Sequence, residues 1–147
     1  MYKTGWIVNG PNLNMLGFRS KEHYGSETYS QLMDSLINYG KSLNLELQAF
    51  QSNHEGEIID KLHTLVKEKC DFIILNMGAL SHYSIAIYDA LEMVKVPMIE
   101  VHLSNIYARE EFRKTSLFTK LCLGQITGFK ERSYYLAIDY LAQLEEK

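Results

Sequence analysis

Residues 72–75, Phe72-Ile73-Ile74-Leu75, form a run of four apolar residues that decides the fold class. A strand in the middle of a parallel sheet is covered on both faces, so its sequence is continuously apolar and does not alternate with polar residues. The run stops at Asn76, where polar residues follow. We therefore predict a fully buried strand here, in a sheet that is covered by helices on both sides.

The same kinds of pattern continue along the chain in both directions. Other short apolar segments predict strands at Gly5–Asn9, Leu43–Phe50, Pro97–Val101 and Leu121–Ile126. Between the strands, apolar residues recur at helical spacing, and Thr28 and Gln31 are spaced as a capping box. The sets at helical spacing are Met33, Leu36, Ile37 and Gly40; Ile58, Ile59, Leu62, Leu65 and Val66; Ile87, Leu91 and Val94; and Tyr134, Tyr135, Ile138, Leu141 and Ala142.

Strands that alternate with helices predict a parallel sheet with helical crossovers. With five strands, the natural expectation is an α/β, flavodoxin-like three-layer sandwich whose five-stranded parallel sheet has the order 2-1-3-4-5. A length of 147 residues is typical of one domain, and the sequence shows neither a linker nor an internal repeat. We therefore expect a single catalytic domain at 1–147.

Composition narrows the functional class. A formal net charge of -3 does not fit a general nucleic-acid binder, which needs a basic face. The sequence has no apolar stretch of the roughly 18 residues that a membrane span requires. Its first ten residues also lack the apolar length of a secretory signal. Cys70 and Cys122 lie in apolar surroundings at no metal-ligand spacing, so we expect two reduced core thiols and a cytoplasmic protein.

Polar residues follow four of the five predicted strands. Ligands of open parallel sheets bind beyond the carboxyl ends of the strands, so these residues are candidates for one site. They are Asn9, Gly10, Pro11, Asn12 and Asn14 after the first strand; Gln51, Ser52, Asn53, His54 and Glu55 after the second; Asn76, Gly78, Ser81 and His82 after the third; and Glu100, His102, Ser104 and Asn105 after the fourth.

Two local patterns within this set suggest acid–base chemistry. Glu100 and His102 are two residues apart at a strand end, so their side chains point to one face, and a carboxylate there would fix the tautomer of the imidazole. The loop 17–26 is bounded by glycines and holds Arg19, His23 and Tyr24, as expected of a lid. A structural ion pair and a plain surface loop are the alternative interpretations. Downstream, one arginine of the turn Arg109–Arg113 is expected to face the same edge.

Several familiar sites are not indicated by the sequence. It lacks the GxxxxGK[ST] and GxGxxG loops that bind nucleotide phosphates, and no His, Cys and carboxylate set has zinc-site spacing. Asn9 and Asn76 stand where a phospho-receiver domain has acidic residues. A flavin-binding module of the same fold remains an alternative, although it predicts a hydroxyl-rich phosphate loop after the first strand.

Four segments resemble the signatures of the type II 3-dehydroquinate dehydratase family, in order and over essentially the whole chain. They are Asn9-Gly10-Pro11-Asn12-Leu13-Asn14 with Leu16-Gly17, Arg19 and Tyr24-Gly25; Gln51-Ser52-Asn53-His54-Glu55-Gly56-Glu57; Asn76-Met77-Gly78-Ala79 with Ser81-His82; and Glu100-Val101-His102-Leu103-Ser104-Asn105 through Arg109-Glu110-Glu111-Phe112-Arg113.

The resemblance implies a hydro-lyase that reversibly removes water from 3-dehydroquinate, giving 3-dehydroshikimate by anti elimination through an enolate. It places the chain in the shikimate pathway of aromatic amino acid biosynthesis or in quinate breakdown. It further implies no cofactor, no metal and no Schiff base. The assembly that it implies is a homododecamer, a tetramer of trimers.

The resemblance also implies a role for individual residues. Tyr24 is the base that takes the proton next to the ketone, and Arg19 supports its ionised form. Asn12 stabilises the enolate through a water molecule, and His102 protonates the leaving hydroxyl while Glu100 orients it. Substrate-binding groups are Asn76, His82, Arg113 and the backbone amides of Leu103 and Ser104, and Asp89 reaches into the neighbouring subunit's site.

Some positions depart from the family pattern, although none of them has a chemical role. They are Met77, Leu80, Phe18, Ser20, Lys21, Lys114 and Thr115. A catalytically silent relative is a second alternative, but it predicts the loss of Tyr24, Arg19 or His102, and all three are present.

Overall fold

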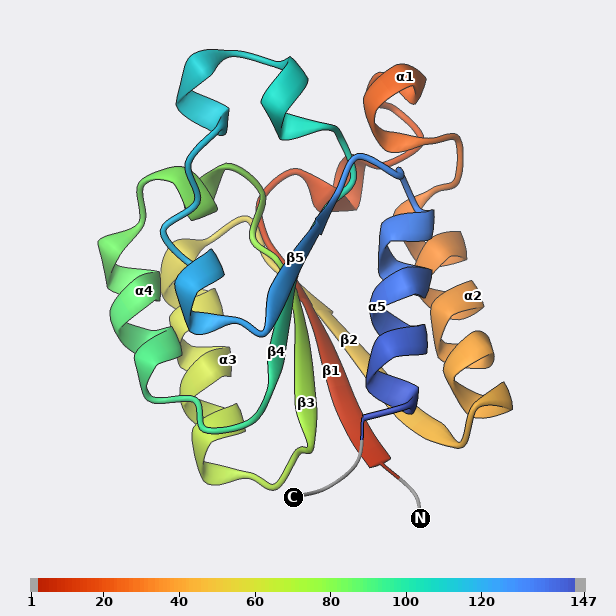
Figure 1. Cartoon of the computed structure of the whole chain (residues 1–147), viewed down its shortest axis with the longest axis vertical. Helices are drawn as coiled ribbons and strands as arrows, with labels where there is room; N and C mark the ends of the chain where they lie inside the picture. Colours follow the sequence, from red (N-terminus) through yellow and green to blue (C-terminus); the bar gives the residue numbers. More distant parts are fainter. Residues whose placement is uncertain (1–2, 145–147) are drawn as a thin grey trace.

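A computed structural model of the chain, which describes residues 3–144, contains one five-stranded parallel sheet in the order β2-β1-β3-β4-β5. The strands are β1 (Lys3–Asn9), β2 (Leu45–Gln51), β3 (Phe72–Asn76), β4 (Met98–His102) and β5 (Gly124–Thr127). Helices lie on both sides of the sheet (Figure 1). The predicted flavodoxin-like α/β sandwich and its strand order are confirmed.

The helices form the two outer layers. They are α1 (Lys21–Tyr24), α2 (Tyr29–Ser42), α3 (Glu55–Lys67), α4 (Ile85–Glu92) and α5 (Arg132–Ala142). In Figure 1, α2 and α5 cover one face of the sheet and α3 and α4 cover the other. The single turn of α1 stands apart, beyond the carboxyl ends of the strands.

The two faces of the sheet contribute to two separate hydrophobic cores. Because successive side chains of a strand point to opposite faces, neighbours in β1 and β3 divide between these cores. Ile7 and Ile74 pack with α2 and α5. Val8 and Ile73 pack with α3 and α4. All four side chains are fully buried, which explains why the sequence of β3 is continuously apolar.

The predicted capping box at the start of α2 is also confirmed. Thr28 Oγ1 accepts from the Gln31 N–H at 3.3 Å, and Gln31 Oε1 accepts from the Thr28 N–H at 3.1 Å. Such a cap contributes about 1 kcal/mol. It fixes the point at which the chain leaves the glycine-bounded loop and enters the helix.

Several predicted strand boundaries were wrong by one to three residues: the first strand begins at Lys3 and not at Gly5, β4 begins at Met98 and not at Pro97, and β2, β4 and β5 each end one residue later than predicted. Two of the strand starts have a clear physical reason. The segment predicted as a strand from Leu121 begins its strand only at Gly124, because Thr119–Leu121 forms a single 3-10 turn. Leu121 and Cys122 pack against the α3–α4 core, so their apolar character reflects burial and not strand pairing. The second strand begins at Leu45 and not at Leu43, since Asn44 has a left-handed φ of 61° at the turn after α2.

Two residues of the predicted helical sets also differ from expectation. Val66 belongs to α3 but is 42% exposed, so it lies beside the buried stripe. Val94 is buried but follows the end of α4. The two cysteines are free thiols; Cys70 is buried, whereas Cys122 is only partly buried.

The carboxyl ends of β1, β2 and β3 are level with one another. Asn9 is the register partner of Gln51 in β2 and of Asn76 in β3, so the loops that follow start side by side. Gly10 donates its N–H to the Asn76 carbonyl at 2.7 Å. A Cβ at Gly10 would lie 2.4 Å from the Met77 carbonyl oxygen, so this close approach requires glycine. Within residues 3–144, no helix has the length and apolar character needed to cross a membrane.

The central position of β3 gives a prediction about stability. Replacing Ile74→Ala leaves a cavity in a fully buried site and should lower the free energy of unfolding by about 2–5 kcal/mol. The matched control Val66→Ala removes a largely exposed side chain and should change it by about 0.5 kcal/mol or less. Urea unfolding monitored by circular dichroism measures both. Equal effects of the two substitutions would contradict this account of the core.

Candidate active site

One pocket lies at the carboxyl ends of the strands and gathers most of the predicted site residues. Of the side chains and backbone groups singled out from the sequence, those that line it are Asn12, Arg19, Tyr24, Asn76, His82, His102, Leu103, Ser104 and Arg113. Glu100 lies behind His102 and contacts it directly. The loops after β1, β3 and β4 therefore converge on one site as expected, whereas none of the residues predicted after the second strand (Gln51, Ser52, Asn53, His54 and Glu55) lines it.

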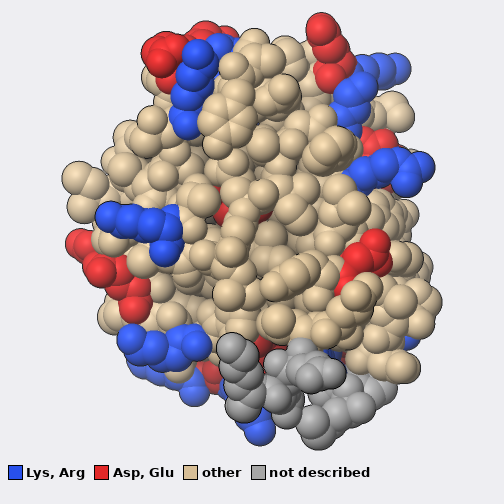
Figure 2. All heavy atoms as spheres, in the orientation of Figure 1, with Lys and Arg blue, Asp and Glu red and all other residues tan. Residues whose placement is uncertain are grey.

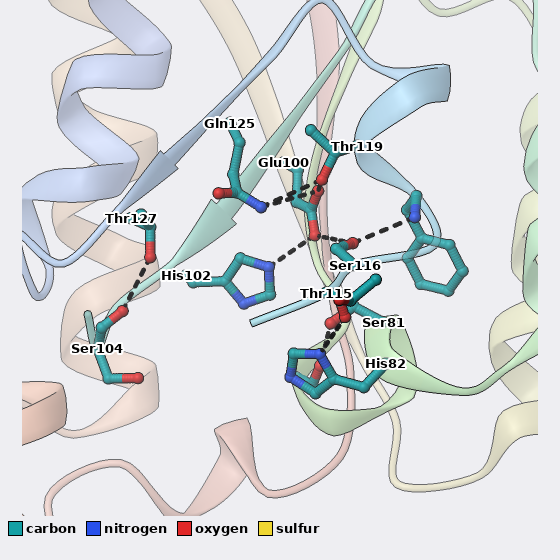
Figure 3. Close-up of polar contacts among 12 residues, drawn as sticks. Ser81, His82, Glu100, His102, Ser104, Thr115, Ser116, Thr119, Gln125 and Thr127 are labelled. Carbon is teal, nitrogen blue, oxygen red and sulfur yellow. Dashed lines mark hydrogen bonds and ion pairs between the residues drawn. The ribbon is translucent and has the colours of Figure 1, made fainter. Parts of the chain in front are cut away.

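Glu100 and His102 form a buried pair on β4. The Nε2 atom of His102 lies 2.6 Å from Glu100 Oε2, and both side chains are almost completely excluded from solvent. Burial by itself raises the pKa of the Glu100 carboxyl, but hydrogen bonds from His102, Ser116 and Thr119 outweigh that effect and hold the pKa below its usual value. An ionised Glu100 accepts the Nε2 hydrogen of His102, so the other ring nitrogen, Nδ1, points away from it (Figure 3).

His82 offers a second imidazole with a different hydrogen-bonding state. Its Nδ1 lies 2.8 Å from the carbonyl oxygen of Thr115, and because a carbonyl only accepts, Nδ1 carries the hydrogen. Burial lowers the pKa of His82, and the nearby His102 and Arg113 lower it further. The neutral ring then presents Nε2 as an acceptor. The two rings stack with their centroids 6.1 Å apart.

The Tyr24 hydroxyl lies between two arginines. Arg19 donates from Nη2 to Tyr24 Oη at 2.6 Å, and Arg109 donates from Nη1 to the same oxygen at 2.6 Å. Arg19 also stacks on the Tyr24 ring, with its Cζ 3.7 Å from the ring centroid. A second contact, from Arg109 Nη1 to Ser104 Oγ at 3.1 Å, ties this cluster to the end of β4. Two adjacent cations stabilise the phenolate form of a tyrosine.

The loop that supplies Arg19 and Tyr24 has glycines in unusual conformations at both margins. Gly17 has φ 95° and Gly25 has φ 86°, which are values that other residues rarely adopt. Between them, α1 places Tyr24 over the pocket. The expected glycine boundaries are present, and in this structure the loop is folded onto the strand ends.

The charge of the pocket is strongly one-sided. Arg19, Arg109 and Arg113 all line it, and within the described part of the chain its lining includes no carboxylate. Arg113 forms a hydrogen-bonded ion pair with Glu110, which is exposed. Burial lowers the pKa of Arg19, and Arg109 and Arg113 add to the effect, but a guanidinium stays charged at neutral pH. The arrangement suits a small anionic ligand.

A buried polar network supports the floor of the pocket. Tyr134 of α5 donates to Asn9 Oδ1 at 2.5 Å and accepts from Asn76 Nδ2 at 2.8 Å. Burial raises the pKa of Tyr134, so its hydroxyl stays protonated and can donate. At the rim, Asn12 has a left-handed φ of 70° and donates its N–H to Asn53 Oδ1 at 2.9 Å. These contacts fix the backbone around the predicted asparagines.

Among the residues to which the resemblance gives a role, Asp89 and Glu100 do not line the pocket, and of these Glu100 contacts His102. Asp89 is the one that has no contact with the site within the described part of the chain. It lies exposed on α4, and its suggested role in a neighbouring subunit stays a prediction. Arg109 is the functional residue that the sequence did not assign. One arginine of the turn 109–113 was expected to face this edge, and both Arg109 and Arg113 do. Across residues 3–144, no group of three His, Cys, Asp or Glu side chains is arranged to hold a metal ion.

The fold and the pocket together define a doubly wound α/β protein with a cationic site for acid–base chemistry on a small anion. Residues 3–142 match the family described as dehydroquinase class II. The chain is 52% identical over 138 residues to the 3-dehydroquinate dehydratase of Caldicellulosiruptor saccharolyticus, covering 94% of this chain and 95% of that protein. It therefore belongs to the class II dehydroquinase family, as the sequence signatures predicted.

Solved structures agree with this assignment over nearly the full length. The type II dehydroquinase from Propionibacterium acnes superimposes with a TM-score of 0.93 at 40% identity, covering 98% of this chain and 99% of that chain. The type II dehydroquinase from Butyrivibrio crossotus gives a TM-score of 0.91 at 46% identity, with coverage of 95% and 97%.

Proposed function

We propose that this chain is a 3-dehydroquinate dehydratase of type II, a hydro-lyase that reversibly converts 3-dehydroquinate to 3-dehydroshikimate in the shikimate pathway. The observation that carries the proposal is the pairing of two groups in one pocket. Tyr24 is held by two guanidinium groups on one side, and His102 is held by a buried carboxylate on the other. An elimination removes a proton from one carbon and a hydroxyl from the neighbouring carbon. It therefore needs a base and an acid in the same pocket.

Tyr24 is the base. A free tyrosine has a pKa of about 10, so forming a phenolate at pH 7 takes about 4 kcal/mol. One guanidinium at about 4 Å contributes on that order where the effective dielectric constant is near 20, and much less in open water. Arg19 and Arg109 both donate to the Tyr24 oxygen at 2.6 Å, so the folded loop places two guanidinium groups where they support a phenolate. The phenolate takes the proton from the carbon next to the ketone, and the electrons of that C–H bond form the enolate.

His102 is the acid. As the enolate reforms the ketone, the bond to the departing hydroxyl breaks, and the imidazolium proton converts that hydroxyl to water. Glu100 supports the positive ring before the transfer. Tyr24 has then gained one proton and His102 has lost one, so the cycle closes when a proton passes back from the tyrosine to the histidine. Asn12 lines the pocket and would hold the water that stabilises the enolate oxygen.

The remaining groups bind the substrate. Arg113 faces the pocket with a charge suited to the carboxylate of 3-dehydroquinate, together with the backbone amides of Leu103 and Ser104. His82 accepts a hydrogen bond from a substrate hydroxyl through Nε2, and Asn76 contributes its side-chain amide. The free thiols Cys70 and Cys122 suit a reducing compartment, which supports a cytoplasmic location.

The same proposal includes self-association as a homododecamer. Charged side chains lie mainly around the margin of the face that presents β5, and its middle is largely uncharged (Figure 2). Leu123, Leu136 and Tyr140 are exposed there and line an open groove beside β5. Exposed apolar surface of this kind marks protein contacts. Asp89, exposed on α4, would complete the site of a neighbouring subunit.

An absorbance assay tests the function directly. Wild-type protein incubated with 3-dehydroquinate should generate the absorbance of a conjugated enone, and the rate should be unaffected by borohydride or a chelator. Tyr24→Phe keeps the ring but removes the base, so its turnover should fall by at least about a hundredfold. If well-folded wild-type protein gives no such signal, the chain would instead be a catalytically silent relative. If the purified protein is yellow, a flavin-binding module would be supported.

The two arginines that hold Tyr24 give a second prediction. Removing either Arg19 or Arg109 weakens the stabilisation of the phenolate, so Arg19→Ala and Arg109→Ala should each lower kcat by about tenfold or more, with a smaller change in KM. The exposed Arg132 on α5 provides the matched control, and Arg132→Ala should keep wild-type kinetics. Unchanged kcat in Arg109→Ala would remove Arg109 from the mechanism.

Mixing of subunits tests the shared site. Light scattering should give a particle twelve times the mass of one chain. Asp89→Ala and Tyr24→Phe should each be impaired alone, and co-refolding them should restore activity, because some sites then combine an intact Tyr24 with an intact Asp89 from a neighbour. A mixture of Tyr24→Phe and His102→Ala is the control, since both residues belong to one chain's pocket, and it should stay inactive. Restoration in neither mixture would argue against a shared site.

A further inference from the structure

The segment Thr115–Thr119 lies next to both histidines: it supplies the carbonyl that holds His82, and it contacts Glu100, which holds His102. It follows the turn Glu111–Arg113 and leads into the 3-10 turn Thr119–Leu121. Its middle is held to the sheet end by the Leu117 N–H, which donates to the Ser81 carbonyl at 2.8 Å. Figure 3 shows Thr115, Ser116 and Thr119 grouped around His82 and Glu100.

Two hydroxyls of this segment contact the Glu100 carboxylate, one on each oxygen. Ser116 Oγ donates to Glu100 Oε2 at 2.5 Å, the same oxygen that lies 2.6 Å from His102 Nε2. Thr119 Oγ1 donates to Glu100 Oε1. Gln125 Nε2 adds a longer contact of 3.4 Å to Oε1. The carboxylate therefore receives donors along both oxygens and has little freedom to rotate.

The direction of these hydrogen bonds is set by what else the hydroxyls do. Ser116 Oγ accepts the Phe118 N–H at 3.1 Å, and Thr119 Oγ1 accepts from Gln125 Nε2 at 3.1 Å. Each hydroxyl has only one hydrogen, and that hydrogen is left to point at Glu100. A carboxyl group surrounded by donors is an acceptor on both oxygens, which is the ionised form. Glu100 is thereby prepared to accept from His102.

We infer that Ser116 and Thr119 are positioning residues for the acid of the reaction. They hold Glu100 in the one orientation in which it takes the Nε2 hydrogen of His102, and so they keep His102 Nδ1 turned toward the pocket. The inference rests on the proposed function of His102 as the proton donor. Neither hydroxyl lines the pocket, so both act through Glu100 and not on the substrate.

Thr115, the residue before Ser116, fixes the hydrogen-bonding state of His82. The Thr115 carbonyl fixes the hydrogen of His82 on Nδ1, as described above. One continuous segment of the chain thus orients His102 through two side-chain hydroxyls and His82 through a backbone carbonyl. The side chain of residue 115 is not needed for this, since the contact uses the carbonyl. Thr115, one of the departures from the family pattern, is therefore compatible with this arrangement.

Kinetics of Ser116→Ala and Thr119→Val test the inference. General-acid catalysis is typically worth roughly a hundred- to ten-thousand-fold, and misorientation of the acid loses part of that factor. We expect kcat to fall by about ten- to a hundredfold in each variant while KM stays within about threefold, because no substrate contact is removed. The conservative Ser116→Thr and Thr119→Ser retain the hydroxyls and should recover most of the activity.

A spectroscopic readout separates positioning from general destabilisation. In 15N-histidine-labelled protein at a pH where the ring is neutral, the ring nitrogens of His102, assigned with His102→Ala, should report hydrogen fixed on Nε2 in the wild type. Ser116→Ala and Thr119→Val should show a mixture of tautomers. The control Ser133→Ala removes a fully buried hydroxyl that accepts the Phe129 N–H, and it should lower stability without changing kcat or the His102 signals.

The outcomes distinguish this inference from the proposed function. An inactive but folded wild type overturns the function itself. An active wild type, with wild-type kcat and His102 signals in both folded hydroxyl variants, overturns only the positioning role. If either variant fails to fold, the comparison of Ser116→Thr and Thr119→Ser with wild type decides, since rescue must restore kcat and the His102 signals together.

Discussion

The buried charge of Glu100 is the constraint around which this end of the molecule is organised. An ionised carboxylate inside a protein is costly unless it is paired and fully hydrogen-bonded. Here its partners come from three places in the chain: His102 from the same strand, Ser116 and Thr119 from the following segment, and Gln125 from β5. The hydrogen bonds to this one carboxylate therefore hold the segment after Arg113 against the sheet, and they also hold the beginning of β5 in place.

The cationic side of the pocket also has an energetic cost, which comes from positive charges in place of a negative one. Arg19, Arg109 and Arg113 repel one another, and burial lowers the pKa of Arg19. What offsets this repulsion is the electron-rich Tyr24 oxygen and, during reaction, an anionic substrate. In the proposed mechanism, the same charges that repel one another would therefore stabilise the phenolate and the enolate. Charge complementarity that develops only in the reacting state is the kind that accelerates a reaction.

Sequence patterns were sufficient for the sheet and for much of the site, for identifiable physical reasons. Burial on both faces explains the run from Phe72 to Leu75, and the shared edge at which parallel strands end explains why Asn76 and His102 line one pocket. The spacing of Glu100 and His102 was informative because strand side chains alternate strictly. The individual roles of these residues came from the resemblance and are not fixed by periodicity.

Other features depend on tertiary contacts that no local pattern contains. Whether Arg109 or Arg113 approaches Tyr24 is decided by the path of the turn across the strand ends, not by their spacing. Ser116 and Thr119 look like ordinary loop residues until Glu100 is placed beside them. Leu121 and Cys122 are apolar because they pack against the α3–α4 core. In the sequence, such a buried apolar segment has the same pattern as a strand.

The two halves of the proposed chemistry are built on parts of the fold with different rigidity. His102 and its carboxylate lie on a central strand, inside a network whose every member is buried or partly buried. Tyr24 and Arg19 lie on a one-turn helix between two glycines, and the contact of Tyr24 with Arg109 joins this loop to the strand ends. An acid that is preorganised needs no reorganisation when the substrate binds, whereas a base on a loop can admit the substrate and become competent as the arginines close around it. In the proposed chemistry the proton donor is therefore in place at all times and the proton acceptor is assembled only when the loop closes, which lets one pocket open to admit the substrate and close before the reaction.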